Sequence, residues 1–231
     1  TLVLWSLPLS VREAFTLTFE APTRVTLLTA HFVHLDRTHY LTNLIGYGLV
    51  AGTGYLCFTR ARERITFLSA ALVTVLLFPI VLSLLSLLVL DTGQGYGLSG
   101  IVAGLLGTTV AGIGVYTRRR LPVAGAISPP LFLGGAVAVA VRLLPPELAR
   151  NGVIIVALLL AGSYLLGISI ESPTDCTDGS VLVPIVGIVT CSVVLFAAFP
   201  RGALANTASP YIHFIGYGLG YLTVYITLRI D

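Results

Sequence analysis

This sequence is poor in charged residues. Only 10% of its 231 residues are charged, whereas 56% are hydrophobic, and the mean hydropathy is +0.96. A soluble domain usually carries about 25% charged residues, so this chain cannot cover a water-facing surface of its own. The composition therefore excludes an ordinary soluble protein. It predicts an all-α membrane protein, because lipid cannot satisfy the backbone of open loops or sheet edges.

Lysine and methionine are absent, and all thirteen basic residues are arginines. The net charge of +3 is small, and the arginines lie in short runs between apolar segments. This pattern is a membrane-topology signal and excludes a nucleic-acid partner. The three cysteines, Cys57, Cys176 and Cys191, form no CxxC pair and no metal-binding spacing, so we expect no disulfide and no cysteine-bound metal. We expect no cofactor.

The chain opens in the middle of an apolar run, without an initiator methionine. We therefore expect a trimmed or processed N-terminus, with residues 1–9 as the tail of an earlier span. Residues 10–30 mix charged and apolar side chains and are predicted to form an interfacial external loop.

Long apolar runs fill the rest of the sequence. A helix needs about 20 residues to cross a bilayer, and seven stretches reach or approach that length. The predicted spans are 38–58, 66–90, 97–117, 128–145, 152–170, 181–199 and 209–229. With no internal repeat, we expect a single polytopic domain over 1–231. It would comprise an N-terminal segment and external loop (1–30), three spans (31–117), additional spans (118–207) and a last helix (208–231).

Two arginine clusters predict the orientation of the spans. Arg60, Arg62 and Arg64 follow the first span, and Arg118–Arg120 follow the third. The positive-inside rule places both clusters on the cytoplasmic side. The odd-numbered spans then begin at the external face of a multi-pass protein of the cell membrane.

A glycine-rich run leads into the third span and ends in Gly97-Leu98-Ser99-Gly100. Glycine allows tight backbone bends, and a serine at a helix N-terminus lies near unpaired N–H groups and the positive end of the helix dipole. By itself, however, GxSG is a weak signal, because a serine in a membrane helix usually bonds a backbone carbonyl.

The last span contains His213, followed by Gly216 and Gly220 on the same helical face. Small residues allow close helix packing, and the third span carries a matching row of glycines. Three spans separate the two helices, so Ser99 and His213 should lie at similar depth below the external surface. The alternative is a lone histidine bonded to a carbonyl.

A third cluster, His31-x2-His34-x4-His39-x3-Asn43, precedes and enters the first span. His39 and Asn43 share a helical face, and both can donate hydrogen bonds. Zinc binding is an alternative, although the sequence has no HExxH motif and Asp36 is the only nearby carboxylate. Plain structural bonding is a further alternative, above all for His31.

Taken together, these residues resemble the rhomboid family of intramembrane serine proteases. The matching motifs are His34-x4-His39-x3-Asn43, Gly97-x-Ser99-Gly100 and His213-x2-Gly216-x3-Gly220, in the family's order. Two features differ. The family has one span between its serine and histidine helices where we predict three, and its external Trp-Arg pair has only Pro22-Thr-Arg24 as a counterpart.

The resemblance implies a Ser-His dyad, with Ser99 as nucleophile and His213 as base. It also implies that Asn43, His39 and the backbone N–H of Ser99 stabilise the oxyanion. His34, Gly97, Gly100, Gly216 and Gly220 would support that site. The implied substrates are transmembrane helices of other proteins, cut on the extracytoplasmic side near small and helix-breaking residues.

Two other functions stay open at this point. A rhomboid-like pseudoenzyme would bind or escort membrane clients, although such proteins typically lack the serine or histidine that this chain has. A transporter would use the histidines and Arg142 as a relay, although Arg142 lies near the end of its predicted span and can extend to the surface.

Overall fold

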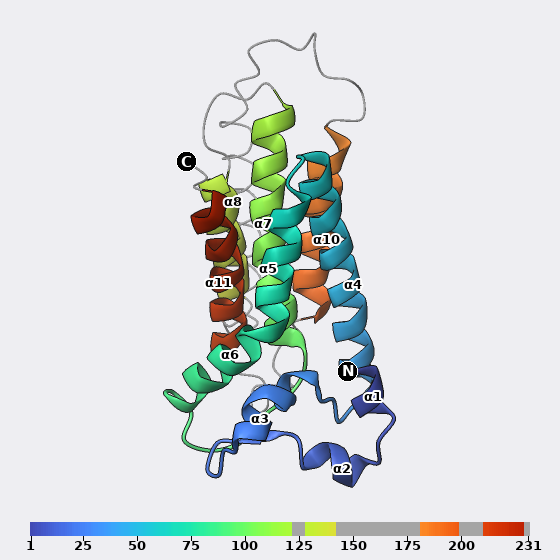
Figure 1. Ribbon diagram of the computed structural model, residues 1–231, viewed down its shortest axis with the longest axis vertical. Helices are drawn as coiled ribbons and strands as arrows, with labels where there is room; N and C mark the ends of the chain where they lie inside the picture. Colours follow the sequence, from blue (N-terminus) through green and yellow to red (C-terminus); the bar gives the residue numbers. More distant parts are fainter. Residues whose placement is uncertain (122–127, 142–180, 199–209, 229–231) are drawn as a thin grey trace.

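The computed structural model describes residues 1–121, 128–141, 181–198 and 210–228. In these ranges the chain is mostly α-helical and forms a helical bundle (Figure 1). The helices of its N-terminal segment are α1 (Leu2–Trp5), α2 (Leu9–Glu13), α3 (Arg24–Thr29) and the 3-10 turn Ala30–Phe32. The bundle helices are α4 (Arg37–Arg60), α5 (Arg64–Leu76), α6 (Phe78–Leu87), α7 (Ser99–Arg120), α8 (Ser128–Val141), α10 (Leu182–Ala198) and α11 (Pro210–Leu228).

The structure confirms the all-α class, and it supports fewer spans than the sequence predicts. Among the described residues, α4 and α7 are long and apolar enough to cross a membrane, and the bent pair α5 and α6 would make a third span. The helices α8, α10 and α11 cover parts of the predicted spans 128–145, 181–199 and 209–229. The predicted span 152–170 lies outside the described residues, so the total of seven stays a prediction.

The second predicted span, 66–90, is not one straight helix. It divides at Leu77 into α5 and α6, which are bent by 44° relative to each other. Pro79 lies in the first turn of α6, where its missing N–H costs nothing, but it could not continue α5 without a clash. This break was not predicted from the sequence, because the whole stretch is apolar.

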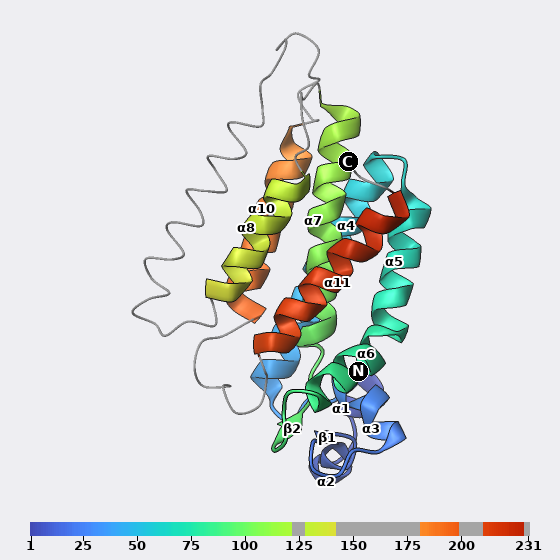
Figure 2. The same cartoon turned by 90° about the vertical axis from the view of Figure 1, so that its left-hand side faces the viewer.

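Helix α7 forms the centre of the bundle. Its residues from Ser99 to Thr117 are buried, and Figure 2 shows it between α8 and α10 on one side and α5 and α11 on the other. A helix that is apolar or small all round can be buried on every side. It ends in Arg118–Arg120, whose charges suit the negative end of the helix dipole.

The two arginine clusters meet at one end of the bundle, which is consistent with the common side predicted for them. Arg119 forms a 2.6 Å ion pair with Glu63, and Arg120 Nε donates to the carbonyl of Arg60 at 2.7 Å. We call this the arginine end. The segment 1–36 and the start of α7 lie at the opposite end (Figure 1).

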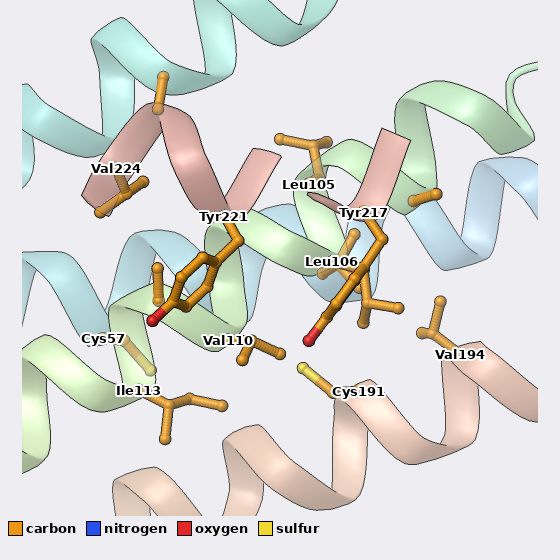
Figure 3. Close-up of a cluster of buried hydrophobic side chains, with 14 of the residues drawn as sticks. Cys57, Leu105, Leu106, Val110, Ile113, Cys191, Val194, Tyr217, Tyr221 and Val224 are labelled. Carbon is orange, nitrogen blue, oxygen red and sulfur yellow. The ribbon is translucent and has the colours of Figure 1, made fainter. Parts of the chain in front are cut away.

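The core between α7, α10 and α11 contains both described cysteines (Figure 3). Cys57 and Cys191 are buried free thiols among apolar side chains, which agrees with the prediction of no disulfide for these two residues. Tyr217 lies beside Cys191 and donates its hydroxyl to the carbonyl of Phe132 at 3.1 Å, which satisfies its polar group. Cys176 lies outside the described residues.

Candidate active site

The chain reaches Ser99 through a turn that only glycine tolerates. Gly97 has φ +104°, and a Cβ atom there would come within 2.6 Å of the His39 ring. Its N–H donates to the carbonyl of Ala30 at 2.9 Å, which ties this turn to the N-terminal segment. Ser99 is then the first residue of α7 and only 5% exposed, beside backbone N–H groups that have no partner within the helix.

His213 faces Ser99 from the first turn of α11. Its Nε2 lies 2.8 Å from the Ser99 Oγ, although 114 residues separate the two. Pro210 begins the helix, where its fixed φ and missing N–H are tolerated. The Ser99 hydroxyl and the His213 imidazole are therefore in contact, as predicted, and the distance suits proton transfer between these atoms.

Glycines bring α7 and α11 into backbone contact. A Cβ on Gly216 would lie 2.5 Å from the Gly100 carbonyl oxygen, and one on Gly220 would collide with the carbonyl of Gly104. Thr108 adds a hydrogen bond from its hydroxyl to the Gly220 carbonyl at 3.2 Å. The predicted glycine-lined face of α11 thus packs on α7, and this close approach sets the position of His213.

His34 and Asn43 form a buried pair behind the start of α7. His34 Nε2 accepts the N–H of Leu98 at 3.3 Å and lies 3.2 Å from the Asn43 Nδ2. Because an amide N–H can only donate, Nε2 presents its lone pair, and the neutral ring carries its proton on Nδ1. Burial, helped by nearby positive charge, lowers the pKa of His34 to about 3, in keeping with this neutral form.

Asn43 is fully buried and retains hydrogen-bonding capacity. Its amide nitrogen carries two N–H groups, of which His34 can take one. Its Oδ1 has no partner among the described residues. His39 is half-buried against Gly97, with its ring centroid 5.1 Å from that of His34 and 5.7 Å from that of Tyr96. The backbone N–H of His39 is capped by Asp36 at 2.7 Å, which fixes the start of α4.

His31 forms a hydrogen bond to a structural partner, which is the alternative stated for it from the sequence. Its Nε2 lies 3.2 Å from the hydroxyl of Ser83, which itself donates to the carbonyl of Leu27 at 2.8 Å. The Ser83 proton is therefore used, so the His31 ring donates to Ser83. Burial lowers the pKa of His31 to about 4, so this ring is also neutral.

All four histidines of the chain thus lie at the end opposite the two arginine clusters, which we call the histidine end. In the part of the chain that the structure describes, no three His, Cys, Asp or Glu side chains are grouped so that they could hold a metal ion. His31 and His34 are engaged with separate partners, which argues against the zinc alternative. Arg142, the other residue of the proposed relay, lies outside the described residues.

Sequence reasoning missed two residues at this end. Arg12 Nη1 donates to the carbonyl of His34 at 2.6 Å, and the guanidinium carbon of Arg12 lies 4.4 Å from the centroid of the Trp5 ring. The expected counterpart of a Trp-Arg pair, Arg24, is instead exposed at the start of α3. Trp5 ends α1 and Arg12 lies in α2, two short helices separated by Ser6–Pro8, so no single helical period signalled their contact.

Comparison with known proteins adds no assignment. No protein-family model, no curated protein and no solved structure matches this chain.

Proposed function

We propose that this chain is an intramembrane serine endopeptidase of the rhomboid type, with Ser99 and His213 as its catalytic dyad. The observation that carries the proposal is the 2.8 Å separation between the Ser99 Oγ and the His213 Nε2. A buried serine paired with an imidazole at a helix N-terminus is the arrangement that nucleophilic catalysis needs.

In this mechanism the Ser99 Oγ forms a bond to a peptide carbonyl carbon and passes its proton to His213. His213 then gives that proton to the leaving amine as the C–N bond breaks, which leaves an ester on Ser99. Water, deprotonated by the same imidazole, hydrolyses the ester and restores Ser99. The close glycine packing of α11 on α7 supports a fixed imidazole position throughout.

The oxyanion of each tetrahedral intermediate would be stabilised at the start of α7. The backbone N–H of Ser99 and the positive end of the α7 dipole favour negative charge there. The second N–H of Asn43 and the ring of His39 would complete the donor set. His34 holds Asn43 on one side and Leu98, the residue before Ser99, on the other.

The proposed substrates are single transmembrane helices that unwind near the external face. Helical backbone hides its carbonyls, so the scissile segment must open before Ser99 can attack. Small residues at the cut and helix breakers nearby would lower the cost of opening. The buried, mostly neutral surroundings of Ser99 suit a peptide that enters from lipid.

The test is cleavage of a fluorescent transmembrane substrate by purified protein in vesicles, together with labelling by a fluorophosphonate probe. Ser99→Ala and His213→Ala should each lower cleavage by at least about 10³-fold, and Ser99→Ala should abolish labelling. Ser192→Ala is the matched control, because that exposed serine only bonds the carbonyl of Ile188 in its own helix.

Equal cleavage by wild type and Ser99→Ala would rule out the mechanism. Client binding without cleavage would favour the pseudoenzyme. Coupled proton or solute flux without labelling would favour the transporter.

A further inference from the structure

The N-terminal segment reaches the histidine end through one side chain. Arg12, at the end of the short helix α2, donates from Nη1 to the carbonyl oxygen of His34 at 2.6 Å. The residue is partly buried, and 22 positions separate the two partners in the sequence. This contact therefore links two segments that are not neighbours along the chain.

An aromatic stack holds the Arg12 guanidinium in place. Its carbon lies 4.4 Å from the centroid of the Trp5 ring, within the range of a cation–π contact. Trp5 in turn stacks on Tyr40 of α4, with ring centroids 4.5 Å apart and planes 3° from parallel. The guanidinium group is thus held by the face of Trp5 and by the carbonyl of His34. Its buried Nε has no hydrogen-bond partner among the described residues.

The His34 ring carries the effect of this contact onward. The carbonyl that Arg12 holds belongs to the residue whose imidazole touches both Asn43 and the N–H of Leu98. Leu98 is directly followed by Ser99. A shift of the His34 backbone would therefore move the amide of Asn43 and the first turn of α7 together.

We propose that Arg12 is a positioning residue for the oxyanion donors, acting through the backbone of His34. This inference rests on the proposed function of Ser99. Arg12 does not touch the reacting atoms; it fixes the ring that orients Asn43 and the residue before the nucleophile. Small displacements of such groups cost rate, because transition-state donors act only over a narrow range of geometry.

The positioning role of Arg12 depends on the planar shape of its guanidinium group as well as on its positive charge. A lysine carries the same charge but cannot stack flat on the indole of Trp5 while donating to a carbonyl. Arg12→Lys should therefore behave like Arg12→Gln and not like wild type. Arg24→Gln is the matched control, because Arg24 is an exposed arginine on the same N-terminal segment.

The first test measures kcat, KM and the thermal unfolding midpoint of these variants with the transmembrane substrate. Arg12→Gln and Arg12→Lys should lower kcat roughly 10- to 100-fold, with KM within about twofold and a midpoint close to that of wild type. Arg24→Gln should match wild type. Unchanged kcat in both Arg12 variants would overturn the inference, as would a loss fully accounted for by unfolded protein.

A double-mutant cycle then tests the route through His34. If Arg12 acts through that residue, Arg12→Gln should add little to the loss already caused by His34→Ala. Independent, multiplicative losses would overturn the proposed route.

A spectroscopic readout separates this inference from the proposed function. With ¹⁵N-labelled histidine, and His34 assigned by its loss in His34→Gln, Arg12→Gln should shift the His34 ring signals, and Arg24→Gln should not. An unshifted His34 signal overturns the inference even if wild type cleaves substrate. A wild-type protein that neither cleaves nor labels defeats the proposed function, while a shifted signal would still support the link from Arg12 to His34.

Discussion

The two ends of the bundle handle polar groups in opposite ways. At the arginine end, charged side chains stay near the surface, and the paired Arg119 and Glu63 side chains are 47% and 19% exposed. At the histidine end, mostly neutral groups are buried against one another, with Asn43 at 0% and His34 at 2% exposure. Surface ion pairs contribute little to stability, whereas buried polar groups must find partners. The proposed function places its chemistry at the histidine end, where buried polar groups are held in fixed positions by one another.

Removing a proposed oxyanion donor should have the largest effect among the changes that spare the dyad. Asn43→Ala should lower kcat by about 10²–10³-fold, because one transition-state hydrogen bond is lost. The measurement is cleavage of the transmembrane substrate at saturating and subsaturating concentrations.

Thr42→Ala is the control for Asn43→Ala, because the Thr42 hydroxyl only bonds carbonyls of its own helix. If Asn43→Ala keeps full kcat, Asn43 does not serve the oxyanion and the buried pair is structural.

The glycine contact behind the dyad offers a matched comparison on one helix. A methyl group at Gly216 would meet the Gly100 carbonyl oxygen at 2.5 Å, whereas one at Gly218 would have nothing within 4 Å. Gly216→Ala should push α11 away from α7, destabilise the protein by about 1–3 kcal/mol and reduce cleavage.

Gly218→Ala should keep both the stability and the cleavage of wild type. The measurement is thermal unfolding in detergent alongside the cleavage assay. Equal behaviour of the two variants would contradict the backbone contact between α11 and α7.

Acidification should reduce the stability contributed by the histidine end, and this loss should begin at a higher pH than the titration of ordinary carboxylates. The pKa values of His34 and His31, about 3 and about 4, lie below the ordinary value near 6.5. The unfolded chain therefore binds protons first as the pH falls. The stability due to these neutral rings is complete above about pH 6.5 and declines below it.

The unfolding midpoint should accordingly fall by several degrees between pH 7 and pH 5. It should fall less steeply in His34→Gln, which has one titrating ring fewer. A midpoint that is constant over this range would show that the rings are not held neutral by the fold.

The smallest effect is expected at the arginine end. Arg119→Gln removes the ion pair with Glu63, but both partners keep some contact with solvent. The free energy of unfolding should change by no more than about 1 kcal/mol, and cleavage should be unchanged. A loss of cleavage comparable to that of Asn43→Ala would erase the contrast between the two ends.

Much of the architecture could be predicted from particular residues. The apolar runs indicated the helices α4 and α7, and the arginine clusters predicted that these helices end on the same side, which agrees with the ion pair between Arg119 and Glu63. The bend between α5 and α6 was missed, because Pro79 falls within a continuous apolar run and hydropathy does not register it. The contact of Arg12 with Trp5 and His34 was also missed, because Trp5 and Arg12 lie in two separate short helices that share no helical period.

The sequence by itself determined that the chain is helical and rich in apolar surface, and it predicted that Ser99 and His213 lie near the starts of helices that enter from the same end. The first two properties follow from composition and from the length of the apolar runs. The prediction follows from the number of spans expected between the two residues. Only the tertiary structure decided that a hydroxyl and an imidazole 114 residues apart come within 2.8 Å, and that Arg12 holds the carbonyl of His34. Such contacts depend on the rotation and crossing of packed helices, and a shift of one residue along either helix would turn these side chains to another face.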